Sequence, residues 1–162
     1  MLITQKQKNR TASLQEKQKS PSLKLEIYLP DHTTYYAIPM LEGKVAAGFP
    51  SSAENYIDKA LDLNELIIKH PSATFFIRVK GDSMENAGIK TNDILIVDRA
   101  VPVTHNKIVI ARISGELTVK RICMIQEKIF LMPDNEHYQP MEITGEMDFE
   151  VWGVVTYVIH QV

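Results

Sequence analysis

Two polar residues, Ser83 and Lys120, have the types and surroundings that could support nucleophilic chemistry. Ser83 follows Gly81 and Asp82 at the end of an apolar run, where glycine permits a sharp turn and backbone amides are left free. A hydroxyl at such a turn could attack a carbonyl carbon, and the free amides could stabilise the oxyanion that forms. The alternative is a serine that only caps the turn, which is the commoner role of this residue type.

A nucleophilic serine needs a base, and Lys120 is the candidate. The five histidines lie mostly in expected loops or at ends of elements, and no motif pairs one of them with Ser83. Successive side chains of a strand point to opposite faces, so Lys120 shares a face with Thr118 and Ile122 while Arg121 points the other way. Among apolar side chains the pKa of a lysine falls from about 10.4 toward roughly 7–8, where it can accept a proton. The alternative is an edge-strand lysine that limits aggregation.

A possible substrate lies in the chain itself, at the Ala47–Gly48 bond. Small side chains on both sides would let the backbone approach a nucleophile closely, and Pro50 keeps Phe49 extended. The same composition suits an ordinary linker, so the residues alone leave both interpretations open.

These residues must be positioned by a mainly β fold. Ser114-Gly115 separates two alternating runs and predicts a hairpin. The region after Pro71 contains six runs rich in strand-forming residues, with turn residues such as Pro133-Asp134-Asn135 between them. The predicted strands are 74–79, 94–98, 107–113, 116–122, 128–132 and 149–159.

Two short helices are predicted ahead of this sheet. Ser51 and Glu54 form a capping box, and apolar residues at 56, 57, 60 and 61 follow with helical spacing. Asp62 is a second capping residue, ahead of the apolar residues 66–68. Pro71 ends this second helix because the residue before a proline disfavours helical geometry.

The chain divides into three expected parts. Residues 1–24 are rich in Gln, Lys and Ser, and we expect a disordered basic tail. Residues 25–47 form an extended N-terminal arm, with strand-like stretches at 25–29 and 35–38. Residues 48–162 form the β domain that would carry catalysis and dimerisation.

Composition narrows the classes of function. The chain has 162 residues and 44% hydrophobic content, with no apolar run of the roughly 20 residues that span a bilayer. No secretory signal is evident, and Cys123 alone cannot form an internal disulfide, so we expect a cytoplasmic protein. Residues 1–47 hold seven basic against four acidic residues, which leaves eleven against sixteen beyond them. This mildly acidic domain argues against broad DNA binding. We expect no metal and no cofactor.

The motifs together resemble the UmuD and MucA mutagenesis proteins, a self-cleaving serine/lysine group that includes LexA. The resemblance covers roughly residues 38–160, and Ser83 lies 35 residues after Gly48 while Lys120 lies 37 after Ser83. The Ala-Gly bond is of the type found in LexA, where the best-known UmuD has Cys-Gly. Asn92 stands where the group usually has glycine, and asparagine tolerates the same left-handed backbone. The stretches that carry the resemblance are Ala-Gly-Phe-Pro-Ser (47–51), Leu-Asn-Glu-Leu-Ile-Ile-Lys-His-Pro-Ser-Ala-Thr-Phe-Phe (63–76), Gly-Asp-Ser-Met (81–84), Asp-Ile-Leu-Ile-Val-Asp (93–98) and Leu-Thr-Val-Lys-Arg (117–121).

The resemblance implies a mechanism and partners. Lys120 would deprotonate Ser83, Ser83 would attack the Ala47 carbonyl, and the backbone amides of Asp82 and Ser83 would hold the oxyanion. Cleavage would be promoted by the RecA filament on single-stranded DNA during the SOS response to DNA damage. The processed homodimer, residues 48–162, would join a UmuC-type Y-family DNA polymerase for error-prone translesion synthesis.

Two alternatives remain at this point. A LexA-like repressor needs a helix-turn-helix, and residues 1–47 hold three prolines and strand-like alternation instead, so we expect no sequence-specific DNA binding. The second alternative is a non-enzymatic β dimer that binds a polymerase or RecA. The resemblance also implies the homodimer, and residues 149–162 are its candidate seam because Val154, Val155, Val158 and Ile159 exceed what one sheet face needs. The alternative is that these side chains are buried within the monomer.

Overall fold

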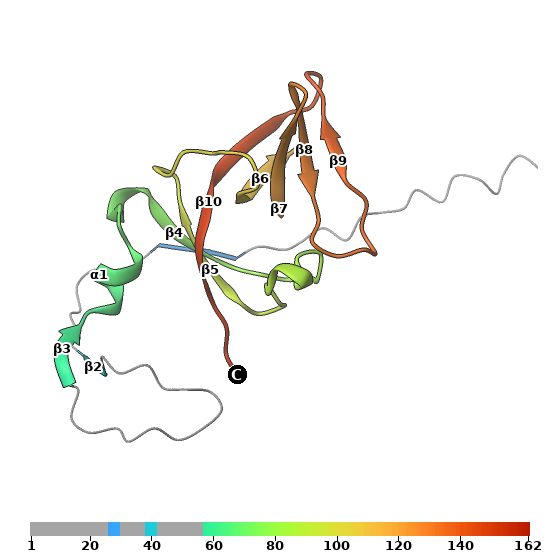
Figure 1. Ribbon diagram of the computed structural model, residues 1–162. Coiled ribbons are helices and arrows are strands. Elements are labelled where there is room, and N and C mark those ends of the chain that lie inside the picture. The colour runs from blue at the N-terminus through green and yellow to red at the C-terminus, as the bar shows by residue number, and fades with distance from the viewer. Residues whose placement is uncertain (1–25, 30–37, 42–56) are drawn as a thin grey trace, which may run out of the picture.

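A computed structural model describes residues 26–29, 38–41 and 57–162 (Figure 1). The main sheet has eight strands in the order β1-β4-β5-β10-β6-β7-β8-β9, and every neighbouring pair is antiparallel. The mainly β, antiparallel fold with short helices is therefore confirmed. Its strands are β1 (Glu26–Tyr28), β4 (Thr74–Arg78), β5 (Ile94–Asp98), β6 (Ile108–Ile113), β7 (Glu116–Ile125), β8 (Lys128–Met132), β9 (Met141–Ile143) and β10 (Phe149–Ile159).

The predicted hairpin between β6 and β7 is present. Ile113 pairs with Glu116, and the two linking residues adopt positive φ angles, 50° at Ser114 and 86° at Gly115. Two positive φ angles are typical of the tight turn whose twist matches that of the flanking strands. The hairpin places Lys120 well inside β7, opposite Val109 of β6.

One predicted helix is wrong. Residues 57–61 form strand β3 (Ile57–Leu61), which pairs antiparallel with β2 (Ile38–Leu41) in a separate two-stranded sheet. The apolar spacing of this segment fits a helix, but pairing with a strand about 20 residues earlier in the chain satisfies its backbone groups instead. The proposed capping residues, Ser51 and Glu54, lie outside the described residues.

The second predicted helix is confirmed as α1 (Leu63–Ile67). The Asp62 carboxylate accepts a hydrogen bond from Asn64 N over 2.7 Å, which caps the helix start as expected. A 3₁₀ turn, η1 (Pro71–Ala73), then leads into β4, and a second, η2 (Glu85–Ala87), follows the Ser83 turn.

Several predictions fall on parts of the chain that the structure does not describe. Within the predicted arm, β1 confirms the strand expected near residues 25–29, and β2 begins at Ile38. The tail 1–24, the rest of the arm, and the Ala47–Gly48 bond lie outside the described residues.

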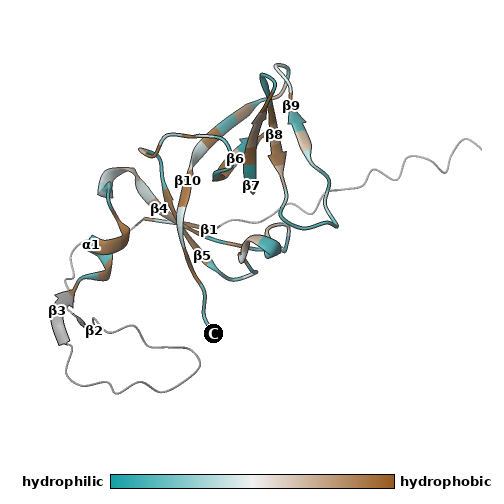
Figure 2. Cartoon of the chain, viewed as in Figure 1, coloured by the Kyte–Doolittle hydropathy of each residue, from teal (hydrophilic) through white to brown (hydrophobic). Residues whose placement is uncertain are grey.

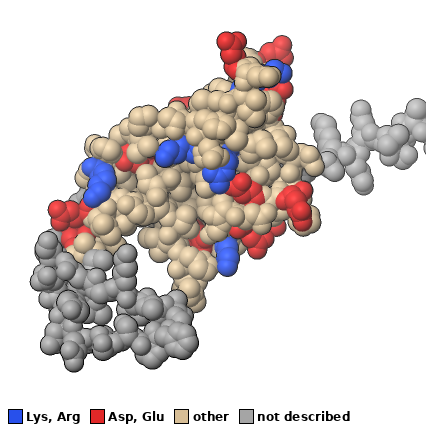
Figure 3. All heavy atoms as spheres, in the orientation of Figure 1, with Lys and Arg blue, Asp and Glu red and all other residues tan. Residues whose placement is uncertain are grey.

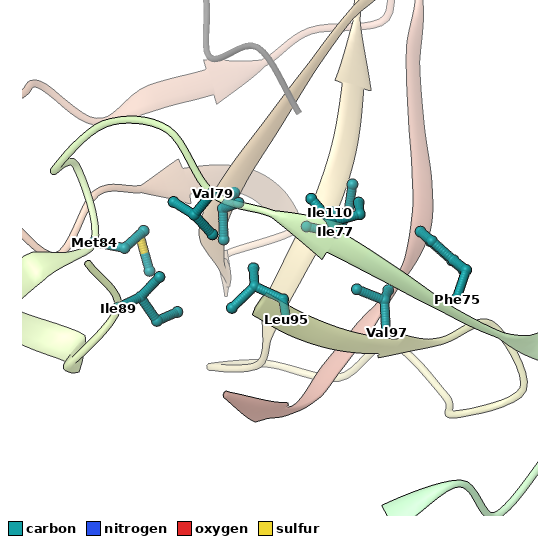
Figure 4. Close-up of a cluster of buried hydrophobic side chains, with 9 residues drawn as sticks. Phe75, Ile77, Val79, Met84, Ile89, Leu95, Val97 and Ile110 are labelled. Atoms are coloured by element: carbon teal, nitrogen blue, oxygen red, sulfur yellow. The ribbon is translucent and has the colours of Figure 1, made fainter. Parts of the chain in front are cut away.

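Most of the buried side chains come from the strands, and they form two clusters. Figure 4 shows the larger cluster, in which Met84 and Ile89 from the segment after Ser83 meet side chains of β4, β5 and β6. Both are almost fully buried, with 2% and 1% of their surface exposed, so this segment is anchored in the core. Figure 2 shows hydrophobic residues concentrated along the central strands. The smaller cluster comprises Val109, Ala111, Ile122, Leu131 and Val154.

The C-terminal strand β10 runs through the middle of the sheet and pairs with both β5 and β6. Val154 is buried in the monomer, whereas Tyr157, Val158 and Ile159 are exposed. Of the four side chains expected in surplus, Val154 is buried and Val155 packs against the core, so only Val158 and Ile159 are exposed. None of the helices in the described part of the chain has the length and hydropathy of a transmembrane span.

Candidate functional site

Ser83 lies in a turn that begins directly after β4. Gly81 has a φ of 119°, a conformation that a glycine adopts without steric cost. The Thr91 hydroxyl bonds both the amide and the carbonyl of Gly81, each over 3.0 Å. On the other side, buried Met84 holds the turn against the core. The turn is therefore anchored on both sides of Ser83, and only 4% of the surface of Ser83 is exposed.

The structure brings Lys120 to Ser83. Lys120 Nζ donates hydrogen bonds to Ser83 Oγ over 2.8 Å, to Thr118 Oγ1 over 3.0 Å and to the Val119 carbonyl over 3.0 Å. Thr118 and Lys120 share one face of β7, as the alternation predicts. The two acceptors on β7, Thr118 Oγ1 and the Val119 carbonyl, hold the nitrogen beside the serine hydroxyl.

Burial lowers the pKa of Lys120 from 10.5 to about 8. The charged form loses solvation beside side chains such as Val109, its partner on β6, which is fully buried. No carboxylate is among the hydrogen-bond partners of Nζ within the described chain, so the lost solvation is not replaced by a counter-charge. A lysine with this pKa is partly neutral near neutral pH and can accept a proton.

The backbone beside Ser83 offers donors for an oxyanion. The Asp82 carbonyl accepts a hydrogen bond from Glu85 N over 3.0 Å. The amides of Asp82 and Ser83 make no hydrogen bond to any other described residue. Two free amides beside a serine hydroxyl are an arrangement that can stabilise the oxyanion of a tetrahedral intermediate.

A further set of residues, which the sequence did not single out, surrounds Asp82. The Tyr138 hydroxyl donates to the Asp82 carboxylate, and Asn135 Nδ2 donates to the Asp82 carbonyl over 3.0 Å. The hydrogen bond to Asp82 raises the pKa of Tyr138. The only sequence signal was Pro133-Asp134-Asn135, which has the composition of an ordinary turn.

None of the described histidines forms a hydrogen bond with Ser83. His70 Nδ1 lies 2.6 Å from an Asp98 carboxylate oxygen, and His160 Nδ1 lies 2.7 Å from Asp93. Both aspartates are buried, so each pair fastens a loop or the C-terminus to β5 or its preceding turn. None of these contacts reaches Ser83.

Other features of the described surface provide no competing centre. A hollow next to β10 is lined by Arg99, Val101 and Trp152, and the Arg99 guanidinium lies 4.8 Å from the ring centre of Phe75. Within the described ranges, no three His, Cys, Asp or Glu side chains gather as a metal site would require. Figure 3 shows basic and acidic side chains interspersed over the visible face.

Comparison with known proteins reveals one family and several relatives. Residues 39–156 match the family described as Peptidase S24-like. Protein MucA of Salmonella typhimurium is 42% identical over 123 residues, covering 75% of this chain and 84% of that protein. Protein ImpA of Escherichia coli is 41% identical over 132 residues, covering 82% and 90%. The LexA repressor of Hahella chejuensis is 38% identical over 138 residues, covering 83% and 68%.

Proposed function

The chain belongs to the Peptidase S24-like family, and from this premise we propose that it is a serine peptidase that cleaves its own Ala47–Gly48 bond. Ser83 is the nucleophile and Lys120 is the general base. The observation that carries the proposal is the 2.8 Å hydrogen bond between Lys120 Nζ and Ser83 Oγ. A lowered lysine pKa at the same position supports it.

The proposed reaction begins with neutral Lys120. Its nitrogen takes the proton of the Ser83 hydroxyl as Oγ bonds to the Ala47 carbonyl carbon. The carbonyl oxygen becomes an oxyanion, which the amides of Asp82 and Ser83 stabilise. The intermediate collapses when the bond to Gly48 breaks, and Lys120 returns the proton to the departing amine. Water then releases Ala47 from Ser83 as a carboxylate.

The biological role that we propose follows the resemblance to the UmuD and MucA group. The RecA filament on single-stranded DNA promotes cleavage in the cytoplasm during the SOS response. The product, residues 48–162, forms a homodimer and serves a UmuC-type Y-family polymerase in error-prone synthesis past lesions. The exposed end of β10, with Tyr157, Val158 and Ile159, is the candidate dimer surface. MucA and ImpA, which align over most of their lengths, support this assignment over that of a repressor.

The test uses the full chain and four proteins: wild type, Ser83→Ala, Lys120→Ala and Lys107→Ala. Lys107 is exposed and serves as the matched lysine control. Each protein is incubated at neutral pH and at about pH 9, with and without RecA, single-stranded DNA and a nucleoside triphosphate, and intact masses are measured. We expect a fragment beginning at Gly48 in wild type and Lys107→Ala only.

If wild type stays whole under every condition, the peptidase proposal is wrong. The remaining interpretation would then be a β dimer that binds a polymerase or RecA without cleavage, with Ser83 and Lys120 in structural roles. A cut at a different bond would retain the nucleophile and base but replace the proposed substrate.

A further inference from the structure

The loop that joins β8 to β9 forms hydrogen bonds to the turn that carries Ser83, which we call the nucleophile turn. Asn135 Nδ2 donates to the Asp82 carbonyl over 3.0 Å, and the Tyr138 hydroxyl donates to the Asp82 carboxylate. Both bonds act on the residue directly before Ser83. The loop therefore fixes the main chain and the side chain of Asp82 separately.

The same loop is tied to the strand that carries the base. Arg121, which follows Lys120 on β7, bonds Asp134 through Nε and Nη2 over 3.0 Å and 2.6 Å. The Asp134 carbonyl in turn accepts the amide of Asn86, three residues after Ser83, over 2.9 Å. Because one loop contacts both sides of the site, it sets the distance between them.

Asn135 is the most constrained member of this loop. Only 9% of its surface is exposed. Its side-chain oxygen accepts the His137 amide over 3.0 Å, and its main-chain oxygen accepts the Tyr138 amide over 3.2 Å. With its oxygen engaged, the amide group cannot flip without losing a hydrogen bond, and Nδ2 stays directed at Asp82.

The geometry of the peptide bond connects the contact between Asn135 and the Asp82 carbonyl to the direction of the Ser83 N–H. The Asp82 carbonyl and the Ser83 amide belong to one planar unit, and they point in opposite directions in a trans peptide. Fixing the carbonyl oxygen by Asn135 Nδ2 and Glu85 N therefore fixes the direction of the Ser83 N–H. That N–H is one of the proposed oxyanion donors.

We propose that Asn135 is a positioning residue for self-cleavage, which acts through Asp82 to orient both the Ser83 amide and the Ser83 hydroxyl. Tyr138 assists it by holding the Asp82 side chain. This inference rests on the proposed function, because it assigns Asn135 a part in the reaction of Ser83.

Three variants separate the contacts. Asn135→Asp keeps the acceptor for His137 N and the shape of the side chain, but it places an oxygen where the donor to Asp82 stood. Tyr138→Phe removes only a hydroxyl. Glu142→Gln is the matched control, since it weakens the ion pair with Lys128 (2.9 Å) in the same β8–β9 hairpin without a contact to the nucleophile turn.

Two rates are measured on each full-length variant. The first is self-cleavage as a function of pH. The second is labelling by a small fluorophosphonate, in which Ser83 Oγ bonds to phosphorus, fluoride leaves and Lys120 takes the proton. The probe does not require the Ala47 segment, so it reports the nucleophile and oxyanion donors alone.

We expect Asn135→Asp to slow both rates by roughly 10- to 100-fold, the scale of a misplacement near 1 Å. Tyr138→Phe should slow both by roughly 3- to 10-fold, about the effect of one hydrogen bond. In Tyr138→Phe the pH midpoint of cleavage should stay at that of wild type, because this change adds no charge near Lys120. Glu142→Gln should match wild type in both rates.

The inference is overturned if Asn135→Asp cleaves slowly but labels at the wild-type rate, since Asn135 would then act on docking of the cleaved segment. Wild-type values for both rates overturn it as well. If Asn135→Asp does not fold, wild-type rates in Tyr138→Phe also overturn it. Failure of wild type itself to cleave or label would instead reject the proposed function.

Discussion

Thr118 Oγ1 accepts a hydrogen bond from Lys120 Nζ over 3.0 Å, two positions earlier on the same face of β7. Thr118 thus stabilises the charged form of the lysine, while burial opposes it. The balance between these effects sets the pKa of Lys120 and therefore the pH at which its amine is neutral.

Replacing Thr118 with valine tests this balance. The methyl group fills the space of the hydroxyl but accepts no hydrogen bond, so the pKa of Lys120 should fall further. We expect the midpoint of the pH–rate profile for self-cleavage to move down by roughly one unit, because a hydrogen bond to a charged group contributes about 1.5 kcal/mol or more. Thr118→Ser should keep the wild-type midpoint. An upward shift in Thr118→Val would contradict the assignment.

The rate of the proposed self-cleavage should itself depend on pH in a defined direction. Lys120 acts as a base only when neutral, and its pKa of about 8 means that the neutral fraction grows as pH rises. The rate should increase about tenfold per pH unit below pH 8 and level off above about pH 9. First-order rates from intact masses between pH 6 and 10 measure this. A rate that falls over that range would exclude Lys120 as the base.

The same pKa shift predicts how folding stability depends on pH. The pKa of Lys120 in the folded state, about 8, lies below its ordinary value of 10.5. Between these values the unfolded chain binds more protons than the folded chain, so stability rises with pH across this window. Across this window the lowered pKa of Lys120 should raise the free energy of unfolding by up to about 3 kcal/mol.

This rise should disappear in Lys120→Met and remain in Lys107→Met, a change at an exposed lysine. Urea unfolding at pH 7.5, 9 and 10.5 gives the free energy of unfolding for each protein. Parallel curves for wild type and Lys120→Met would show that the lysine is not desolvated in solution.

The strands were predictable because their signal is local. Ile94–Asp98, Lys128–Met132 and Phe149–Ile159 have the bounds that composition and flanking turns indicate. β3 was missed because its apolar spacing fits a helix and its partner β2 is distant in the chain. β9 has only three residues, which is too short for a period to register.

The sequence indicates Ser83 and Lys120 as separate candidates, but it does not show that their side chains meet. Ser83 and Lys120 are 37 positions apart, and their contact depends on the β6–β7 hairpin and the Ser83 turn meeting in space. Neither segment alone excludes a capping serine or a surface lysine. The proposed role of Asn135 had no local signal, since an asparagine with a buried contact to Asp82 cannot be distinguished in sequence from an ordinary turn asparagine.

A single added methyl group should also lower folding stability most at the centre of the sheet. At Gly153 of β10, an added Cβ would lie 2.8 Å from Val97 Cγ1 and 3.1 Å from the Asp98 carbonyl oxygen. The carbonyl belongs to the backbone of β5, which cannot retreat without disturbing the β5–β10 pairing. We therefore expect Gly153→Ala to lower the free energy of unfolding by about 1–3 kcal/mol.

Gly145 provides the matched control for this prediction. A Cβ there meets nothing within 4 Å, and the backbone does not require a left-handed conformation. Gly145→Ala should change stability by less than about 0.5 kcal/mol, or raise it slightly by restricting the unfolded chain. Thermal and urea unfolding of the two variants provide the measurement: equal effects at both glycines would mean that β10 does not pack against β5 as closely as the 2.8 Å contact requires.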